Sequence, residues 1–397
     1  MRDLDPGTSF ILAVDPRPHP RPAMPHPLHL ALRFARGWSN PPRRLTESEL
    51  RIEPFGEGDP VAGTLLAPAG SGPLPGWVVL HGITRKGRRH PMLLRFTRAL
   101  AGTGARVLIP EVPEWVDLDL APARAHSIVR GAVQALATRG DVEGARVALT
   151  GFSFGGPQAL LAASMADEVR GVLAWGSYAD LERTVDFHFT GEDEFDEAGV
   201  PGRVLRPDPY GRWVVGANCL PLLEGELTPV ARALHALAAR AGDLSVDGRS
   251  PELEGLREEI RGKMTPSHRE LLDLFAPPEG RRPERSAALE LSRRMTAAAR
   301  QAHPLLDPIP NLAPIPVPVR LLHGRDDLLI PYTETLALAR ALHDRTSDLK
   351  TGITGLFAHS RDREDAPPGG IRGMVARSRD ALHFLGMLSR AFEIVRA

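Results

Sequence analysis

The sequence predicts an α/β fold in which helices flank a mostly parallel sheet and a mainly helical segment is inserted as a cap. From residue 61 onward, short apolar runs alternate with helix-like segments, which is typical of a parallel sheet covered by helices. Glycines follow several of the helix-like segments, where a left-handed residue often closes a helix. The alternation breaks once, between residues 181 and 315, and this break predicts the insertion.

The order of the segments predicts how the chain is organised. The prolines near the start predict an N-terminal arm over residues 1–50, followed by the first part of the core over 51–180. The helical cap insertion is expected over 181–315 and the second part of the core over 316–397. Strands are expected at 62–67, 76–82, 105–110, 145–151, 171–176, 317–324 and 350–357. Helices are expected at 91–104, 123–140, 333–344 and 371–392, with another directly after Ser153.

The composition limits the classes of partner. The 397 residues are 42% hydrophobic and 25% charged, which excludes disorder over the whole chain. Lys plus Arg and Asp plus Glu number 49 each, so no overall field favours nucleic acid or an anionic membrane. We therefore expect no nucleic acid partner and a partner chosen by a local site, and the composition leaves the oligomeric state open.

Other sequence features bear on location and cofactors. No stretch approaches the roughly 18 uncharged apolar residues of a membrane span, so no integral membrane segment is expected. The single cysteine, Cys219, excludes an internal disulfide and fits a cytoplasmic protein. The acidic run 191–199 is expected to be a solvated loop. The histidines of the Pro-rich stretch are not expected to come together as ligands of a metal ion, because that stretch is extended. We expect neither a metal nor a cofactor.

The stretch "GFSFGG", residues 151–156, places Ser153 where a buried strand turns sharply into a helix. A tight turn of this kind needs glycines, because residues without a Cβ let the backbone reverse closely. A G-x-S-x-G turn between strand and helix exposes the serine hydroxyl as a nucleophile. The alternative is a helix N-cap, in which the hydroxyl satisfies a free backbone N–H.

A serine hydroxyl is a poor nucleophile at neutral pH, so it needs a base and a group that orients the base. Asp326 and Asp327 follow a predicted strand and are candidates for the orienting acid, and Asp180 is a third. His359 follows the last predicted strand and is the candidate base. These residues occur in the chain order serine, aspartate, histidine.

With these motifs, residues 61–397 outside the insertion resemble the α/β-hydrolase superfamily. The resemblance implies that Asp327, four residues before the proline of "DLLIP", is the catalytic acid. It also implies that the backbone N–H groups of Ile83, in "HGI", and of Phe154 form the oxyanion hole. His81 and His323 are then expected to be structural.

The predicted function is that of a serine hydrolase that cleaves a small-molecule carboxylic ester through an acyl-enzyme on Ser153. Two alternatives remain open: a peptidase or acyl-thioester hydrolase of the same fold, and a catalytically idle binding module. Four basic residues beside the presumed oxyanion loop either favour an anionic substrate or are solvated: Arg85, Lys86, Arg88 and Arg89.

The insertion is expected to lie over the carboxyl ends of the strands as a lid, because ligands of open parallel sheets bind beyond those ends. Its apolar residues form either the inner surface of a substrate pocket or the core of the insertion itself. These residues are Trp213, Val214, Val215, Leu220, Leu222 and Leu223.

Overall fold

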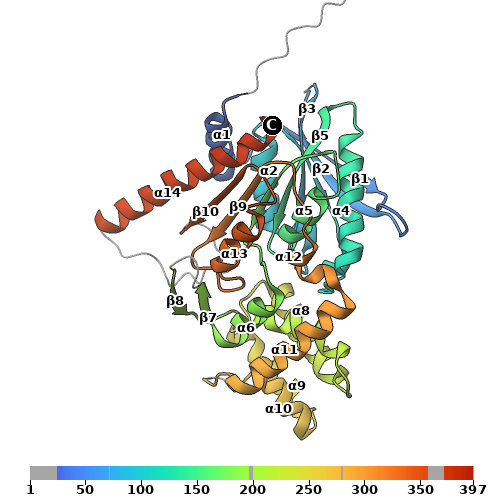
Figure 1. Ribbon diagram of the computed structural model, residues 1–397, viewed down its shortest axis with the longest axis vertical. Coiled ribbons are helices and arrows are strands. Elements are labelled where there is room, and N and C mark those ends of the chain that lie inside the picture. Colours follow the sequence, from blue (N-terminus) through green and yellow to red (C-terminus); the bar gives the residue numbers. More distant parts are fainter. Residues whose placement is uncertain (1–24, 71, 196–199, 279, 356–370, 397) are drawn as a thin grey trace, which may run out of the picture.

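An eight-stranded sheet forms the centre of the computed structural model, which describes residues 25–70, 72–195, 200–278, 280–355 and 371–396 (Figure 1). The strand order is β1-β2-β4-β3-β5-β6-β9-β10. β2 is antiparallel to both of its neighbours, and the remaining pairs are parallel. The strands are β1 (Leu45–Ile52), β2 (Val61–Pro68), β3 (Leu74–Leu80), β4 (Arg106–Pro110), β5 (Val142–Phe152), β6 (Val169–Trp175), β9 (Val319–Gly324) and β10 (Leu349–Thr354). The predicted fold class is confirmed.

Helices cover both faces of this sheet, because successive side chains of a strand point to opposite faces. Along β5, Val147 and Leu149 join one hydrophobic cluster and Ala148 joins the other. One face is covered by α1 (Pro27–Ser39), α2 (Pro91–Ala101) and α14 (Ile371–Phe392). The other is covered by α4 (Pro122–Ala137), α5 (Gly155–Ala163) and α13 (Tyr332–Leu342). The short α3 (Pro113–Val116) follows β4.

The expected N-terminal arm over residues 1–50 is wrong for residues 27–50. Pro27 occupies the first turn of α1, where its fixed φ and missing N–H suit a helix start. The helix buries Leu30, Ala31 and Phe34 on one face, and β1 pairs with β2 along its length. The prolines therefore suggested an extended chain, whereas Pro27 begins a helix. Residues 1–24 lie outside the described residues.

Most of the segment between β6 and β9 forms a group of elements at one end of the sheet, in the lower part of Figure 1, whereas its last helix, Pro308–Asn311, lies beside α5. It is mainly helical but also contains a two-stranded hairpin. Its elements are α6 (Leu181–Thr190), β7 (Glu192–Phe195), β8 (Val200–Val204), α7 (Pro209–Cys219), α8 (Thr228–Leu244), α9 (Glu254–Gly262), α10 (Pro266–Phe275), α11 (Arg285–Ala302) and α12 (Pro308–Asn311).

The acidic run in this segment is not simply a solvated loop, since its residues 192–195 form β7. Asp193 is buried, and its carboxylate accepts a hydrogen bond of 2.7 Å from Arg203 Nε. The ion pair explains why a carboxylate can be buried in a hairpin.

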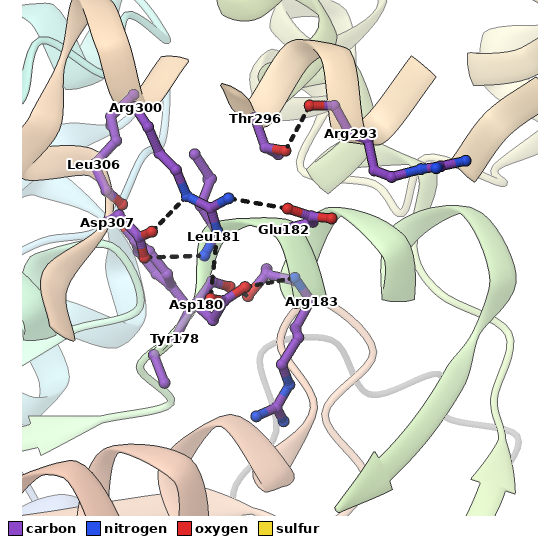
Figure 2. A network of polar contacts seen from close by, with 12 residues as sticks. Tyr178, Asp180, Leu181, Glu182, Arg183, Arg293, Thr296, Arg300, Leu306 and Asp307 are labelled. Carbon is purple, nitrogen blue, oxygen red and sulfur yellow. Dashed lines mark hydrogen bonds and ion pairs between the residues drawn. The ribbon is translucent and has the colours of Figure 1, made fainter. Parts of the chain in front are cut away.

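A network of charged side chains ties the two ends of this segment together (Figure 2). Arg300 of α11 contacts three carboxylates: Nε to Asp307 at 2.6 Å, Nη1 to Glu182 at 2.9 Å and Nη2 to Asp180 at 3.3 Å. Asp180 also caps α6 by accepting a hydrogen bond from the N–H of Arg183. The point where the chain leaves the sheet after β6 is thereby fastened to the point where it returns.

We predict that Arg300→Ala lowers the free energy of unfolding by about 1–3 kcal/mol, because three partly buried carboxylates lose a shared donor. Denaturant unfolding measures the change. Arg293→Ala is the matched control on the same helix, since Arg293 is 61% exposed and forms an ion pair with Glu290, which is 59% exposed. Equal losses in the two variants would show that the network contributes no more than a surface pair.

Candidate active site

Ser153 occupies a strained turn between β5 and α5. Its φ of 52° is in the left-handed region, which costs a residue with a Cβ on the order of 1–3 kcal/mol. The turn is held by a 2.8 Å hydrogen bond from Ser153 N to Trp175 O and a 3.0 Å bond from Gly156 N to Ser153 O. A Cβ on Gly151 would lie 2.1 Å from Gly155 O, so the close approach of strand and helix requires glycine there.

The alternative role of Ser153 as the N-cap of α5 is wrong. The residue at the cap position is Phe154, and the cap makes no side-chain hydrogen bond to the helix. Ser153 instead lines a cavity at the carboxyl ends of the parallel strands. The N–H of Phe154, at the start of the helix, belongs to the first turn, whose N–H groups have no partner within the helix.

His81 holds the loop that follows β3. Its Nε2 accepts a hydrogen bond from Val112 N at 3.2 Å, so Nδ1 carries the proton and donates to Gly82 O at 2.7 Å. Burial lowers the pKa of His81 to about 4, which keeps the imidazole neutral near pH 7. Because the carbonyl and N–H of a trans peptide point in opposite directions, this bond directs the Ile83 N–H away from His81.

The same loop lies directly beside Ser153. A Cβ built on Gly82 would be 3.2 Å from Ser153 Cβ. Gly82, Ile83, Ser153 and Phe154 all line one cavity. The structure thus brings together the predicted nucleophile and the two residues whose N–H groups are the predicted oxyanion donors.

The three candidate acids have different environments. Asp327 is fully buried, and its Oδ1 accepts hydrogen bonds from Leu329 N at 2.9 Å and Ile330 N at 3.1 Å. Asp326 has a side chain that is 73% exposed and lies 3.8 Å from Arg203. Asp180 is engaged by Arg300 in the network at the base of the insertion.

The predicted base, His359, lies outside the described residues, in the stretch between β10 and α14. His323, at the end of β9, is buried, with Nδ1 2.7 Å from Thr335 Oγ1 and Nε2 2.9 Å from Ile330 O. Its ring nitrogens therefore bridge the loop that carries Asp327, which fits a structural role.

The cavity at Ser153 has a volume of about 1350 Å³ and is lined on one side by the inserted segment. Val214 and Val215 of α7 line it, whereas Trp213 is buried and donates from Nε1 to Phe275 O at 2.9 Å. Leu220 is also buried in the core. Both alternatives for the apolar residues of the insertion are therefore realised, each by different residues.

Several hydrogen bonds join the insertion to the loops around Ser153, and no sequence pattern predicted the following three. Tyr210 OH donates to Ile83 O at 3.2 Å, and Asp208 N donates to Leu328 O at 3.0 Å. His188 Nε2 donates to Leu329 O at 2.7 Å, and burial lowers the pKa of His188 to about 4. The Asp-Pro pair at 208–209 does signal a helix start, but no local pattern reveals partners more than a hundred residues away.

The basic residues near Ile83 are mostly engaged within the protein. Arg85 donates to Val116 O and lies 3.2 Å from both Asp117 and Asp243. Arg88 is buried and pairs with Glu49 and Glu111. Lys86, beside Ser245, is the member of the cluster that lines the cavity.

Two further properties concern the described part of the chain as a whole. None of its helices is both long and apolar enough to cross a bilayer. Within the same ranges, no three His, Cys, Asp or Glu side chains are grouped as they are around a metal ion.

The strand order, the turn at Ser153 and the loop after β3 identify the α/β-hydrolase fold, as the resemblance implied. No protein-family model and no curated protein sequence matches the chain. Among solved structures, it is similar to brefeldin A esterase, a bacterial homologue of human hormone sensitive lipase. That match has 16% identity, covers 94% of this chain and 89% of that one, and has a TM-score of 0.45.

Two other solved structures show a similar degree of likeness. Esterase Est22 has 12% identity over 88% of this chain and 79% of its own, with a TM-score of 0.47. Acylaminoacyl peptidase of Pyrococcus horikoshii has 12% identity over 86% of this chain, with a TM-score of 0.43. The match covers only 41% of the peptidase, so this chain spans less than half of its length.

One acid in the cavity wall gives a pH-dependent prediction. Burial, and then the nearby Asp247, raise the pKa of Asp208 to about 7, although Tyr210 N and Gly248 N donate to its Oδ1. The folded state then holds a proton that the unfolded state releases, so stability falls as pH rises from about 4 to about 7. We expect the melting temperature of Asp208→Asn to fall less over that range than that of the wild type.

Calorimetry at several pH values measures this difference. Asp326→Asn is the control, because it removes a carboxyl that is 73% exposed and does not line the cavity. Parallel pH profiles for Asp208→Asn and the wild type would contradict a raised pKa at Asp208.

Proposed function

We propose that this protein is a serine hydrolase that cleaves carboxylic esters through an acyl-enzyme on Ser153. The observation that carries the proposal is the strained φ of 52° at Ser153, in a turn that opens on a cavity beside the Gly82–Ile83 backbone. Strain of this kind persists where the surrounding structure enforces it, and it is concentrated at functional sites.

The proposed triad is Ser153, Asp327 and His359. β5, β9 and β10 run parallel, so the segments that follow them leave the same edge of the sheet. The nucleophile and the buried acid follow the first two of these strands, and the residues after β10 include His359. This common edge supports assigning His359 as the base.

In the proposed reaction, His359 accepts the proton of Ser153 Oγ as the oxygen attacks the ester carbonyl carbon. Asp327 holds the imidazole in the required tautomer and stabilises its protonated form. The tetrahedral intermediate expels the alcohol, which takes the proton from His359, and leaves the acyl group on Oγ. A water molecule, deprotonated by His359, then attacks the acyl carbon of the acyl-enzyme. The bond between this carbon and Ser153 Oγ breaks, His359 returns the proton to Oγ, and the carboxylic acid is released. No cofactor or metal takes part in these steps.

The negative charge of each tetrahedral intermediate is stabilised in this proposal by the backbone N–H groups of Ile83 and Phe154. Loss of one such donor typically costs about 3 kcal/mol in the transition state. His81 acts as a positioning residue, because its bond to Gly82 O orients the peptide that carries the Ile83 N–H. The apolar side chains of Ile83 and Phe154 do not weaken this role, which uses only their backbone.

We propose that residues 181–315 form a cap over the site, with residues 51–180 and 316–397 as the core. The cavity lined by both Ser153 and α7 supports this division. Because the Ile83 loop and the Asp327 loop both accept hydrogen bonds from the insertion, the cap acts as a fixed wall that shapes the pocket. Its apolar residues would help to exclude water during acyl transfer.

We predict that Ser153→Ala abolishes hydrolysis of para-nitrophenyl acetate and shifts the melting temperature little, or upward. The substitution removes the nucleophile but leaves the backbone hydrogen bonds of the turn in place. Steady-state kinetics and calorimetry provide the two readouts, and turnover of an aminoacyl anilide by the wild type would instead indicate a peptidase. Wild-type activity in the variant would rule out Ser153 as the nucleophile.

We expect Asp327→Asn to lower kcat by about three to four orders of magnitude, because the imidazole of His359 would be held in the wrong tautomer. Asp326→Asn is the adjacent control and should change kcat by less than about tenfold. Asp180→Asn tests the third candidate and should act on stability, because Asp180 contacts Arg300. A larger kinetic loss in either control than in Asp327→Asn would overturn the choice of acid.

A further inference from the structure

The cavity at Ser153 has one part that the cap lines and a second part that lies between three helices covering one face of the sheet. We call this second part of the cavity the arm. α1, α2 and α14 pack together in one hydrophobic cluster on that face. The arm is lined by Leu32, Ala35 and Trp38 of α1, Met92 of α2, and Phe384 and Leu385 of α14. Ser39 of α1 also lines the cavity, but none of the lining side chains of these three helices carries a charge, so the arm offers mainly apolar surface.

An aromatic floor connects this arm to the nucleophile. Phe152 immediately precedes Ser153, and its ring contacts Phe96 of α2 edge to face, with centroids 4.9 Å apart. The ring also stacks on Trp175 at 5.9 Å, and Trp175 contacts Phe384 of α14 at 6.1 Å. All four side chains line the cavity. The apolar surface is therefore continuous from Ser153 to the arm.

Exposed apolar side chains gather at the mouth of the arm. In the described part of the chain, seven large apolar side chains are exposed, and three of them, Leu32, Met92 and Leu382, line this cavity. They come from three different helices, and their exposed fractions are 48%, 50% and 71%. Apolar area left in water is unfavourable, so a cluster at a cavity mouth marks a surface that an apolar ligand covers.

The walls of the arm are held in fixed positions. Trp38 stacks on Phe34 with centroids 6.3 Å apart, and the guanidinium of Arg95 lies 4.7 Å from the centre of its ring. Arg95 Nε also donates to Trp38 O at 2.7 Å. A preformed wall of this kind costs little entropy when a flexible chain binds against it.

We propose that the arm between α1, α2 and α14 binds the acyl chain of the substrate and makes the enzyme selective for esters of medium- to long-chain fatty acids. This inference rests on the proposed hydrolase function. The acyl group is the part of the substrate that stays attached to Ser153 Oγ, and the floor of the arm begins at Phe152. A cavity of about 1350 Å³ also exceeds the roughly 300–1,000 Å³ of pockets for drug-sized ligands.

Two pairs of variants test the proposal. Ala35→Trp fills the arm, and Arg36→Trp places the same side chain at an exposed position of α1 outside the cavity. Leu32→Glu places a charge in the arm. Leu28→Glu places the same charge one helical turn away and outside the cavity, at a leucine that is 41% exposed. The two members of each pair carry the same new residue on the same helix.

The first readout is kcat/KM for octanoyl and acetyl esters of para-nitrophenol. Each methylene that binds apolar surface is worth up to about fourfold, so the octanoyl-to-acetyl ratio should exceed about tenfold in the wild type. Ala35→Trp and Leu32→Glu should lower this ratio by about tenfold or more, chiefly through a lower kcat/KM for the octanoyl ester. Arg36→Trp and Leu28→Glu should keep the wild-type ratio. A ratio that is the same in all five proteins overturns the proposal.

The second readout is equilibrium binding of the fluorescent fatty acid cis-parinaric acid to the Ser153→Ala protein, which requires no hydrolysis. Binding should weaken by about tenfold or more on adding Ala35→Trp or Leu32→Glu, and not on adding either control. If this pattern holds while Ser153→Ala still hydrolyses esters, acyl-chain binding in the arm is supported and Ser153 is not the nucleophile. If Ser153→Ala is inactive but no arm variant changes binding or the ratio, the proposed hydrolase function is supported and acyl-chain binding in the arm is refuted.

Discussion

The turn between β5 and α5 is the constraint on which the rest of the structure depends. Ser153 stays at φ 52° because the strand and the helix approach so closely that Gly151, Gly155 and Gly156 have no room for a Cβ. A Cβ on Gly156 would lie 1.8 Å from Ser177 Oγ, and one on Gly155 would lie 2.7 Å from His81 O. The packing that holds Ser153 in its strained conformation therefore also sets the positions of the β3 and β6 loops around it.

The insertion extends this constraint to the other side of the cavity. Its two ends are fastened at the sheet by Arg300, and its interior donates hydrogen bonds to the Ile83 loop and to the Asp327 loop. The loops that carry the proposed oxyanion donor and acid are thus each held from both the core and the insertion. In our proposal this preorganisation keeps the reacting groups in place without movement of the cap.

Local patterns predicted the parts of the molecule that local interactions determine. Alternating apolar and helix-like segments predicted seven strands and the helices between them, and the glycines of "GFSFGG" predicted the turn at Ser153. The motif around Asp327 singled out the carboxylate that proves to be buried, whereas its role and that of His359 stay predictions. α1 and β1 were missed because the prolines around them suggested an extended arm.

Contacts between distant segments could not be predicted from the sequence. Tyr210 and Ile83 are 127 residues apart, and His188 and Leu329 are 141 apart. No periodicity or motif links such pairs, because the folded sheet alone brings them together. The same holds for the apolar arm, since α1, α2 and α14 come from three separate regions of the chain.

The most direct test of the central claim is mass spectrometry of the intact protein after reaction with a fluorophosphonate, followed by peptide mapping of the modified site. The account predicts the addition of one phosphonyl group, located on Ser153 in the peptide that spans β5 and α5. The prior addition of an ester substrate should slow the labelling. An adduct on a different residue, or ester hydrolysis that continues after Ser153 is fully labelled, would contradict the account.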